Sequence, residues 1–95
     1  MRSVEWSSRA ERDLEMIDDY WSSYSEASAD GVLTRLEAAS TFLARTPKAG
    51  PLLAETDARK WTVRGSPYIL IYRIHPDRIE ILRVHHGSEN WLDPN

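Results

Sequence analysis

The chain has 95 residues, of which 41% are hydrophobic and 28% charged, a composition typical of an ordinary globular protein and not of a disordered chain. We expect a single domain over residues 1–95, with residues 85–95 as a C-terminal tail. No apolar run approaches the roughly 20 residues of a membrane helix, and the N-terminus has no secretory apolar segment. The absence of cysteine excludes disulfides and thiolate metal sites. Together these features favour the cytosol.

The net charge of −3 hides an uneven distribution of charge along the chain. Residues 1–45 hold five basic and nine acidic side chains, a balance of −4. Residues 56–85 hold six basic and three acidic side chains, a balance of +3. Such a split predicts two surfaces with different partners, with scattered solvated charge as the simpler alternative.

The first half of the chain predicts a short strand followed by two amphipathic helices. Ser3–Trp6 alternates polar and apolar residues, as a strand does. Ser8, with Glu11 three residues later, has the form of a capping box that begins the first helix. The second helix is expected to begin at Ser25 and to end before Pro47. Each helix carries an apolar stripe, so the two should form an antiparallel hairpin. The stripes comprise Ala10, Leu14, Ile17, Trp21 and Tyr24, and then Ala29, Val32, Leu33, Leu36, Ala39, Ser40 and Leu43.

Three runs of β-forming residues follow a loop over residues 47–55. Their expected bounds are 59–64, 68–74 and 78–84, separated by short turns that contain Gly or Pro. The middle run is apolar on both faces and should be the central strand of the three. We therefore expect an α+β fold in the order β-α-α-β-β-β, in which the N-terminal strand and the helical hairpin pack on a small antiparallel sheet. The first strand should join this sheet at an edge.

Four segments in this order resemble the RelE/ParE toxin superfamily along essentially the whole chain. They are residues 8–14 (SRAERDL), 43–50 (LARTPKAG), 68–74 (YILIYRI) and 79–87 (IEILRVHHG). The paired helices and the His-Gly after the last strand look more like the ParE subfamily than the RelE subfamily. The resemblance implies the toxin of a type II toxin–antitoxin system, without a cofactor, held inactive in a hetero-oligomer with a cognate ParD-like or similar antitoxin.

The two subfamilies differ in mechanism. ParE-like toxins inhibit DNA gyrase by binding, whereas RelE-like toxins are ribosome-dependent endoribonucleases that cut mRNA. RNA cleavage needs cations for the developing phosphorane, together with a base and an acid. However, Ile69 stands where such nucleases often carry arginine, and Ser88 and Glu89 replace a basic pair after Gly87. We therefore expect gyrase binding without catalysis, and keep a RelE-like nuclease and a degenerate non-toxic member as alternatives.

The resemblance and the basic strands suggest a target-binding surface on the sheet and tail. Arg73 and Arg83 are expected on neighbouring antiparallel strands as a basic pair on one face, whereas an ion pair of Arg83 with Glu80 or Glu89 is the structural alternative. Trp91 stands alone in a polar tail, as an anchor or folded back on the sheet. The residues expected to bind the target are Arg59, Arg73, Arg83, His86 and Trp91.

For the nuclease alternative, the catalytic candidates are His85, His86, Arg83 and Arg59. The two adjacent histidines should point to opposite sides of the strand, so at most one faces a given cleft and the pair cannot easily share a metal ion. We expect no metal site.

The antitoxin is expected to fold over the helical hairpin and beside an open sheet edge. The expected contacts are Leu14, Trp21, Leu33, Leu36 and Tyr68. Neither a membrane nor sequence-specific DNA is expected as a partner.

Overall fold

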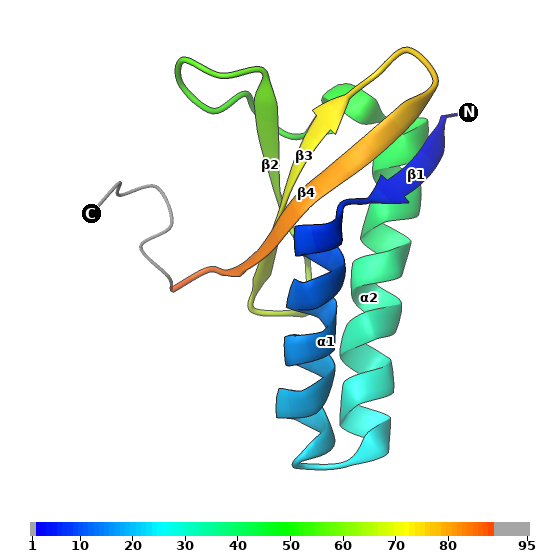
Figure 1. Ribbon diagram of the computed structural model, residues 1–95, viewed down its shortest axis with the longest axis vertical. Helices are drawn as coiled ribbons and strands as arrows, with labels where there is room; N and C mark the ends of the chain where they lie inside the picture. The colour runs from blue at the N-terminus through cyan, green and yellow to red at the C-terminus, as the bar shows by residue number, and fades with distance from the viewer. Residues whose placement is uncertain (1, 89–95) are drawn as a thin grey trace.

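A computed structural model describes residues 2–88 (Figure 1). Two long helices stand side by side and cover one face of a four-stranded sheet, and the end of the hairpin that holds their connection projects beyond the sheet (Figure 1). Neither helix is long and apolar enough to cross a membrane, within the residues described. The elements are β1 (Ser3–Trp6), α1 (Ser8–Ser22), α2 (Glu26–Arg45), the 3₁₀ turn η1 (Pro47–Ala49), β2 (Ala58–Thr62), β3 (Tyr68–Ile74) and β4 (Arg78–His86).

The sheet has the order β1-β4-β3-β2, so the predicted α+β fold and the edge position of the first strand are confirmed. The expectation of a purely antiparallel sheet is wrong, because β1 pairs with β4 in parallel. Ser7, which directly follows β1, donates its backbone N–H to the carbonyl of Ile81 and its hydroxyl to the carbonyl of Leu82. These bonds fix the start of α1 on the edge of β4, and β1 approaches that point parallel to β4, with Ser3 beside Arg78 and Trp6 beside Ile81.

The helix boundaries follow from local capping. Ser7, and not Ser8, caps α1, because the Ser7 hydroxyl accepts the N–H of Ala10 at 3.0 Å. The expected cap of α2 is confirmed, since Ser25 accepts the N–H of Ser28 at 3.0 Å. This helix ends at Arg45 before Pro47, as the sequence predicts.

The strand bounds differ from the expected ones at three ends, and the first of these is the start of β2, which lies at Ala58 and not at residue 59. β2 ends at Thr62 and not at residue 64, because the chain from Val63 turns into β3: Ser66 donates to the carbonyl of Val63, and Gly65 has a φ of 78°. β4 continues to His86, two residues beyond the expected end. The first two residues of the expected tail therefore belong to the sheet.

The main core lies between the helices and the sheet. Ile17, Leu36 and Leu43 from the helices are buried in one cluster with Leu70 and Tyr72 of β3, as the sequence predicts. Leu14 is only partly buried against this cluster. A smaller apolar cluster lies on the opposite face of the sheet and comprises Ala58, Ile69 and Ile71, with Leu53 and Leu82 packed against it.

The strand β4 contains one extra residue relative to β3. Ile71 pairs with Arg83 whereas Tyr72 pairs with Ile81, so Leu82 is the residue without a partner in the register. Because of this bulge, the buried positions of β4 change from odd residue numbers, at Ile79 and Ile81, to an even one, at Val84. The bulge follows the last residue that β1 covers, Ile81.

Candidate functional site

A groove of about 610 Å³ runs between α1 and the end of β4. Its walls hold Trp21 and Tyr68, whose side chains are joined by a hydrogen bond of 2.8 Å from the indole N–H to the hydroxyl. The ring of His86 stands perpendicular to that of Tyr68, with the ring centres 5.6 Å apart. The groove thus brings together Trp21 and Tyr68, which were expected to contact an antitoxin, and His86, which was expected to contact the target.

The outer rim of this groove holds large side chains of which two, Met16 and Tyr20, lie outside the predicted apolar stripe, whereas Tyr24 belongs to it. Met16 and Tyr20 line the groove, and Tyr24 continues the row one turn further. Met16 is 71% exposed. A hydrogen bond of 3.4 Å between the hydroxyls of Tyr20 and Tyr24 raises the pKa of Tyr20 above its ordinary value. The signal in the sequence was the spacing of four residues between these three positions.

A carboxylate at the side of the groove joins α1 to β4. Asp13 accepts two hydrogen bonds from Arg83, at 2.8 Å and 3.1 Å, and a third of 2.8 Å from the backbone N–H of Val84. The N–H of Val84 lies on the edge of β4 beyond the stretch that β1 covers. Asp13 therefore closes this part of the edge and sets the distance between the two walls of the groove.

A second groove, of about 350 Å³, lies between the two helices on the side of β1. Leu14 and Leu33 line it, and Leu36, which is fully buried, can only form its floor. Three carboxylates also line the groove, from Glu15, Asp18 and Glu37. An apolar trough with an acidic rim suits an amphipathic segment that carries basic residues beside its apolar side chains.

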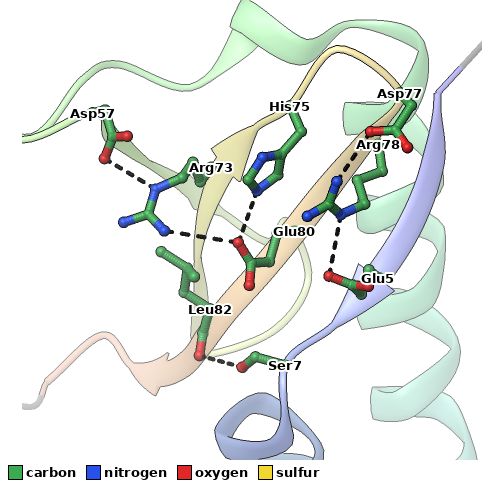
Figure 2. A network of polar contacts seen from close by, with 9 residues as sticks. All are labelled: Glu5, Ser7, Asp57, Arg73, His75, Asp77, Arg78, Glu80 and Leu82. Carbon is green, nitrogen blue, oxygen red and sulfur yellow. Dashed lines mark hydrogen bonds and ion pairs between the residues drawn. The ribbon is translucent and has the colours of Figure 1, made fainter.

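The open face of the sheet carries a network of ion pairs (Figure 2). Arg73 lies between two carboxylates, 3.0 Å from Asp57 and 3.7 Å from Glu80, and Glu80 also meets His75 at 2.9 Å. Because Arg83 binds Asp13 instead, the expected basic pair of Arg73 and Arg83 does not form. The expected alternative, an ion pair of Arg83 with Glu80, does not form either.

A separate ion pair joins the edge strand to β4. Arg78 contacts Glu5 at 3.2 Å and Asp77 at 3.0 Å (Figure 2), and these hydrogen bonds, Glu5 first, raise the pKa of Arg78 above its ordinary value. Each of the two arginines thus contacts two carboxylates, Asp57 and Glu80 for Arg73 and Glu5 and Asp77 for Arg78.

The other expected site residues are dispersed. Arg59 donates to the carbonyl of Gly50 at 2.8 Å and so holds the loop after α2. His85 pairs with Ile69 in the register and His86 with Tyr68, which places the two histidines on opposite faces, as the sequence predicts. Nδ1 of His86 accepts the backbone N–H of Ser88 at 3.1 Å, a contact with the turn that follows β4. Trp91 and Glu89 lie outside the described residues.

A tyrosine hydroxyl supports the loop that Arg59 holds. Tyr72 donates to the carbonyl of Pro47 at 2.6 Å and accepts the N–H of Gly50 at 3.0 Å. Burial raises the pKa of Tyr72, against smaller opposite effects of Gly50 and Arg59. Across residues 2–88, no three side chains of His, Asp or Glu gather in an arrangement that could hold a metal ion.

Comparison with known proteins gives concordant results. Residues 4–91 match the family described as ParE toxin of type II toxin–antitoxin system, parDE. The chain is 32% identical over 90 residues to the protein Y4kP of Sinorhizobium fredii, with 95% of this chain and 93% of that protein covered. It is 28% identical over 90 residues to Toxin RelE3 of Caulobacter vibrioides, with 94% and 98% covered.

Two solved structures share the fold. A chain of the chromosomal ParDE toxin–antitoxin system from P. aeruginosa has a TM-score of 0.79 at 22% identity, with 90% of this chain and 96% of that chain covered. A chain of the E. coli DinJ-YafQ toxin–antitoxin complex has a TM-score of 0.62 at 16% identity, with 92% and 93% covered.

Proposed function

This chain belongs to the ParE toxin family of type II toxin–antitoxin systems, and from this premise we propose that it acts in the cytoplasm by binding and inhibiting DNA gyrase. A cognate antitoxin neutralises it by forming a hetero-oligomer. Binding, and not RNA cleavage, is the mode of action in this proposal.

The observation that carries this choice is the apolar character of the open sheet face at Ile69. A ribonuclease of this fold would need cations there to stabilise the phosphorane. Instead, Ile69 is only 9% exposed and packs with Ala58 and Ile71. The neighbouring cation Arg73 is engaged by carboxylates, and Arg59 by a backbone carbonyl. These contacts support a surface without phosphoryl-transfer chemistry.

The antitoxin in this proposal contacts both grooves that flank α1. One is the aromatic groove of Trp21 and Tyr68, and the other is the trough of Leu14 and Leu33 with its acidic rim. A chain that folds on binding can lay successive segments into two separate grooves, because it is not rigid beforehand. The antitoxin segment in the trough should carry basic residues, since three carboxylates surround it.

The proposal is tested by supercoiling of a relaxed plasmid by purified gyrase holoenzyme, with the toxin added alone and then with its antitoxin. We expect inhibition by the toxin alone and recovery at equimolar antitoxin. A parallel primer-extension assay on translating ribosomes measures mRNA cleavage. Cleavage that disappears in His85→Ala or His86→Ala, together with normal supercoiling, would replace this proposal by the RelE-like activity.

A further inference from the structure

A cationic and aromatic surface lies on the side of the molecule where α2 meets β2, away from the grooves that flank α1. Phe42 of α2 and Trp61 of β2 stack there, with ring centres 5.2 Å apart and planes inclined by 26°. Two hollows, of about 280 Å³ and 530 Å³, share Trp61 and Arg64 in their walls. The smaller is also lined by Arg35 and the larger by Lys60. We call Arg35, Phe42, Lys60, Trp61 and Arg64 the Trp61 surface.

The three cations of this surface have no carboxylate in either hollow. In the described part of the chain, no ion pair engages Arg35, Lys60 or Arg64, whereas Arg73, Arg78 and Arg83 each contact a carboxylate. The folded chain as a whole is acidic, with a net charge of −3. Three like charges gathered around one aromatic stack repel one another, so this arrangement gains most from an anionic partner.

The position of Arg35 is fixed toward this surface. Its guanidinium donates to the carbonyl of Gly31 at 3.2 Å, and its Nε lies only 3.0 Å from where a Cβ on Gly65 would stand. The side chain therefore reaches from α2 across to the turn after β2, beside Arg64. Gly65 has a φ of 78°, so the turn needs glycine both for its backbone and for the room that Arg35 occupies.

The outer edge of β2 is accessible next to the same residues. Residues 51–53 cover this edge only as far as Lys60, whose N–H donates to the carbonyl of Pro51 at 3.1 Å. No described segment pairs with the outer edge at Thr62, which is exposed and lines the larger hollow. An extended segment can therefore lie along this edge, with its side chains over Trp61 and between the cations.

From these contacts we infer that the Trp61 surface binds an extended acidic segment of the toxin's target protein, in which an apolar side chain rests on the Phe42–Trp61 stack and carboxylates meet Lys60 and Arg64. The inference rests on the proposed function, and it moves the target contacts from Arg59, Arg73 and Arg83 to cations that no described carboxylate engages. A nucleic acid is less suited to this surface, because its affinity depends on many neutralised phosphates. In addition, one face of the Trp61 ring is already occupied by Phe42.

The test uses the double variant Lys60→Glu/Arg64→Glu in the full chain, with Arg9→Glu/Arg12→Glu as a control of equal charge change on exposed positions of α1. Growth arrest on induction reports target binding whatever the target is, and inhibition of purified gyrase identifies it. We expect the Trp61-surface variant to lose growth arrest and to need at least about tenfold more protein for half-inhibition. Thermal melting and antitoxin affinity should stay as in the wild type. The charge-preserving variant Lys60→Arg/Arg64→Lys should retain both activities.

The outcomes separate the two proposals. If the wild type arrests growth without affecting supercoiling, gyrase is not the target, while the loss of arrest in the variant still supports the Trp61 surface. Growth arrest by a folded Lys60→Glu/Arg64→Glu protein at the wild-type level overturns the inference. A tenfold loss of antitoxin affinity in that variant also overturns it, by assigning the surface to the antitoxin. Binding of a fluorescent single-stranded oligonucleotide by the wild type, lost in the variant, assigns the surface to nucleic acid instead.

Discussion

The carboxylate of Asp13 and the guanidinium of Arg83 form a two-point contact between α1 and β4, with N–O distances of 2.8 Å and 3.1 Å. The Asp13 side chain is only 12% exposed and also receives the N–H of Val84. One side chain thus satisfies both a cation and an edge amide of the sheet.

Removal of this carboxylate should be costly. Asp13→Ala deprives Arg83 and the Val84 amide of the same partner, so the free energy of unfolding should fall by about 1–3 kcal/mol. Glu5→Ala is the matched control, because it also removes a carboxylate that is paired with an arginine, Arg78. The Glu5 side chain, however, is 53% exposed. That control should cost less than about 1 kcal/mol. Urea titration of both variants measures the difference, and equal losses would contradict the role given to Asp13.

The hydroxyl of Tyr72 should stabilise the loop after α2. Tyr72→Phe leaves the carbonyl of Pro47 and the N–H of Gly50 without this partner, at a cost of about 1–3 kcal/mol at neutral pH. Chemical denaturation of the wild type and the variant gives this value. A loss below the error of the titration would mean that water replaces the hydroxyl.

The contribution of Tyr72 should also depend on pH. Burial raises the pKa of Tyr72, so the unfolded chain ionises first, at a pKa of about 10, while the folded chain keeps the neutral hydroxyl. The stability that this hydroxyl contributes is complete below pH 10 and falls as the pH rises above it. The difference in unfolding free energy between wild type and Tyr72→Phe should therefore shrink between neutral pH and pH 11. Subtraction of the two curves removes the titration of the lysines, which is common to both.

Two glycines should respond to alanine in opposite directions. A Cβ at Gly50 would lie 2.2 Å from the backbone oxygen of Lys60, so Gly50→Ala forces the loop away from β2 and should destabilise the protein by several kcal/mol, on the order of 3. A Cβ at Gly31 meets only the end of the Arg35 side chain, at 3.4 Å. Within α2, Gly31→Ala should instead stabilise by up to about 1 kcal/mol. Thermal melting of the pair distinguishes a steric cause from a general sensitivity to alanine.

The trough between the helices should carry antitoxin affinity. Leu33→Glu adds a carboxylate to a groove already lined by Glu15, Asp18 and Glu37, and removes its apolar wall. We expect at least about a tenfold loss of antitoxin affinity. Thr34→Glu, at the exposed neighbouring position, has the same charge change and should bind within about twofold of the wild type. Isothermal titration with the purified antitoxin measures both, and similar affinities of the two variants would exclude the trough.

The periodicity of the sequence predicts most of this fold, because both helices and the central strand bury an apolar set with a clear spacing. Leu36, Leu70 and Tyr72 lie in the core for this reason. The direction of β1 was not predictable, since a four-residue strand has no signal for parallel or antiparallel pairing. The bulge at Leu82 was also not predictable from the sequence. Both faces of this sheet bury apolar residues, so an apolar side chain at this position does not reveal a break in the alternation.

The charged residues of the site were less predictable than the apolar ones. Two arginines on neighbouring strands form a basic pair only if no carboxylate lies closer to either of them. Asp13 pairs with Arg83 and Asp57 with Arg73, although each aspartate is remote from its arginine in the sequence. Position on a strand says little about such partners, because they come from a helix and a loop. The cations that no carboxylate of residues 2–88 engages, such as Arg64, could be recognised only after the internal ion pairs were known.

The pairing of β1 with β4 also constrains how the chain can fold. Ser7 contacts Leu82, 75 residues later, and the residues that pair with β1 in the sheet, Arg78 to Ile81, all lie in β4. A nascent chain that has reached residue 77 already holds both helices, β2 and β3, but the stripe of α1 has no Ile79, Ile81 or Val84 to cover it. The slow step should therefore be closure of a loop that spans most of the chain. Until that closure, the apolar stripe of the helical hairpin is exposed and can bind another protein. The lifetime of this open form is therefore a property on which selection can act.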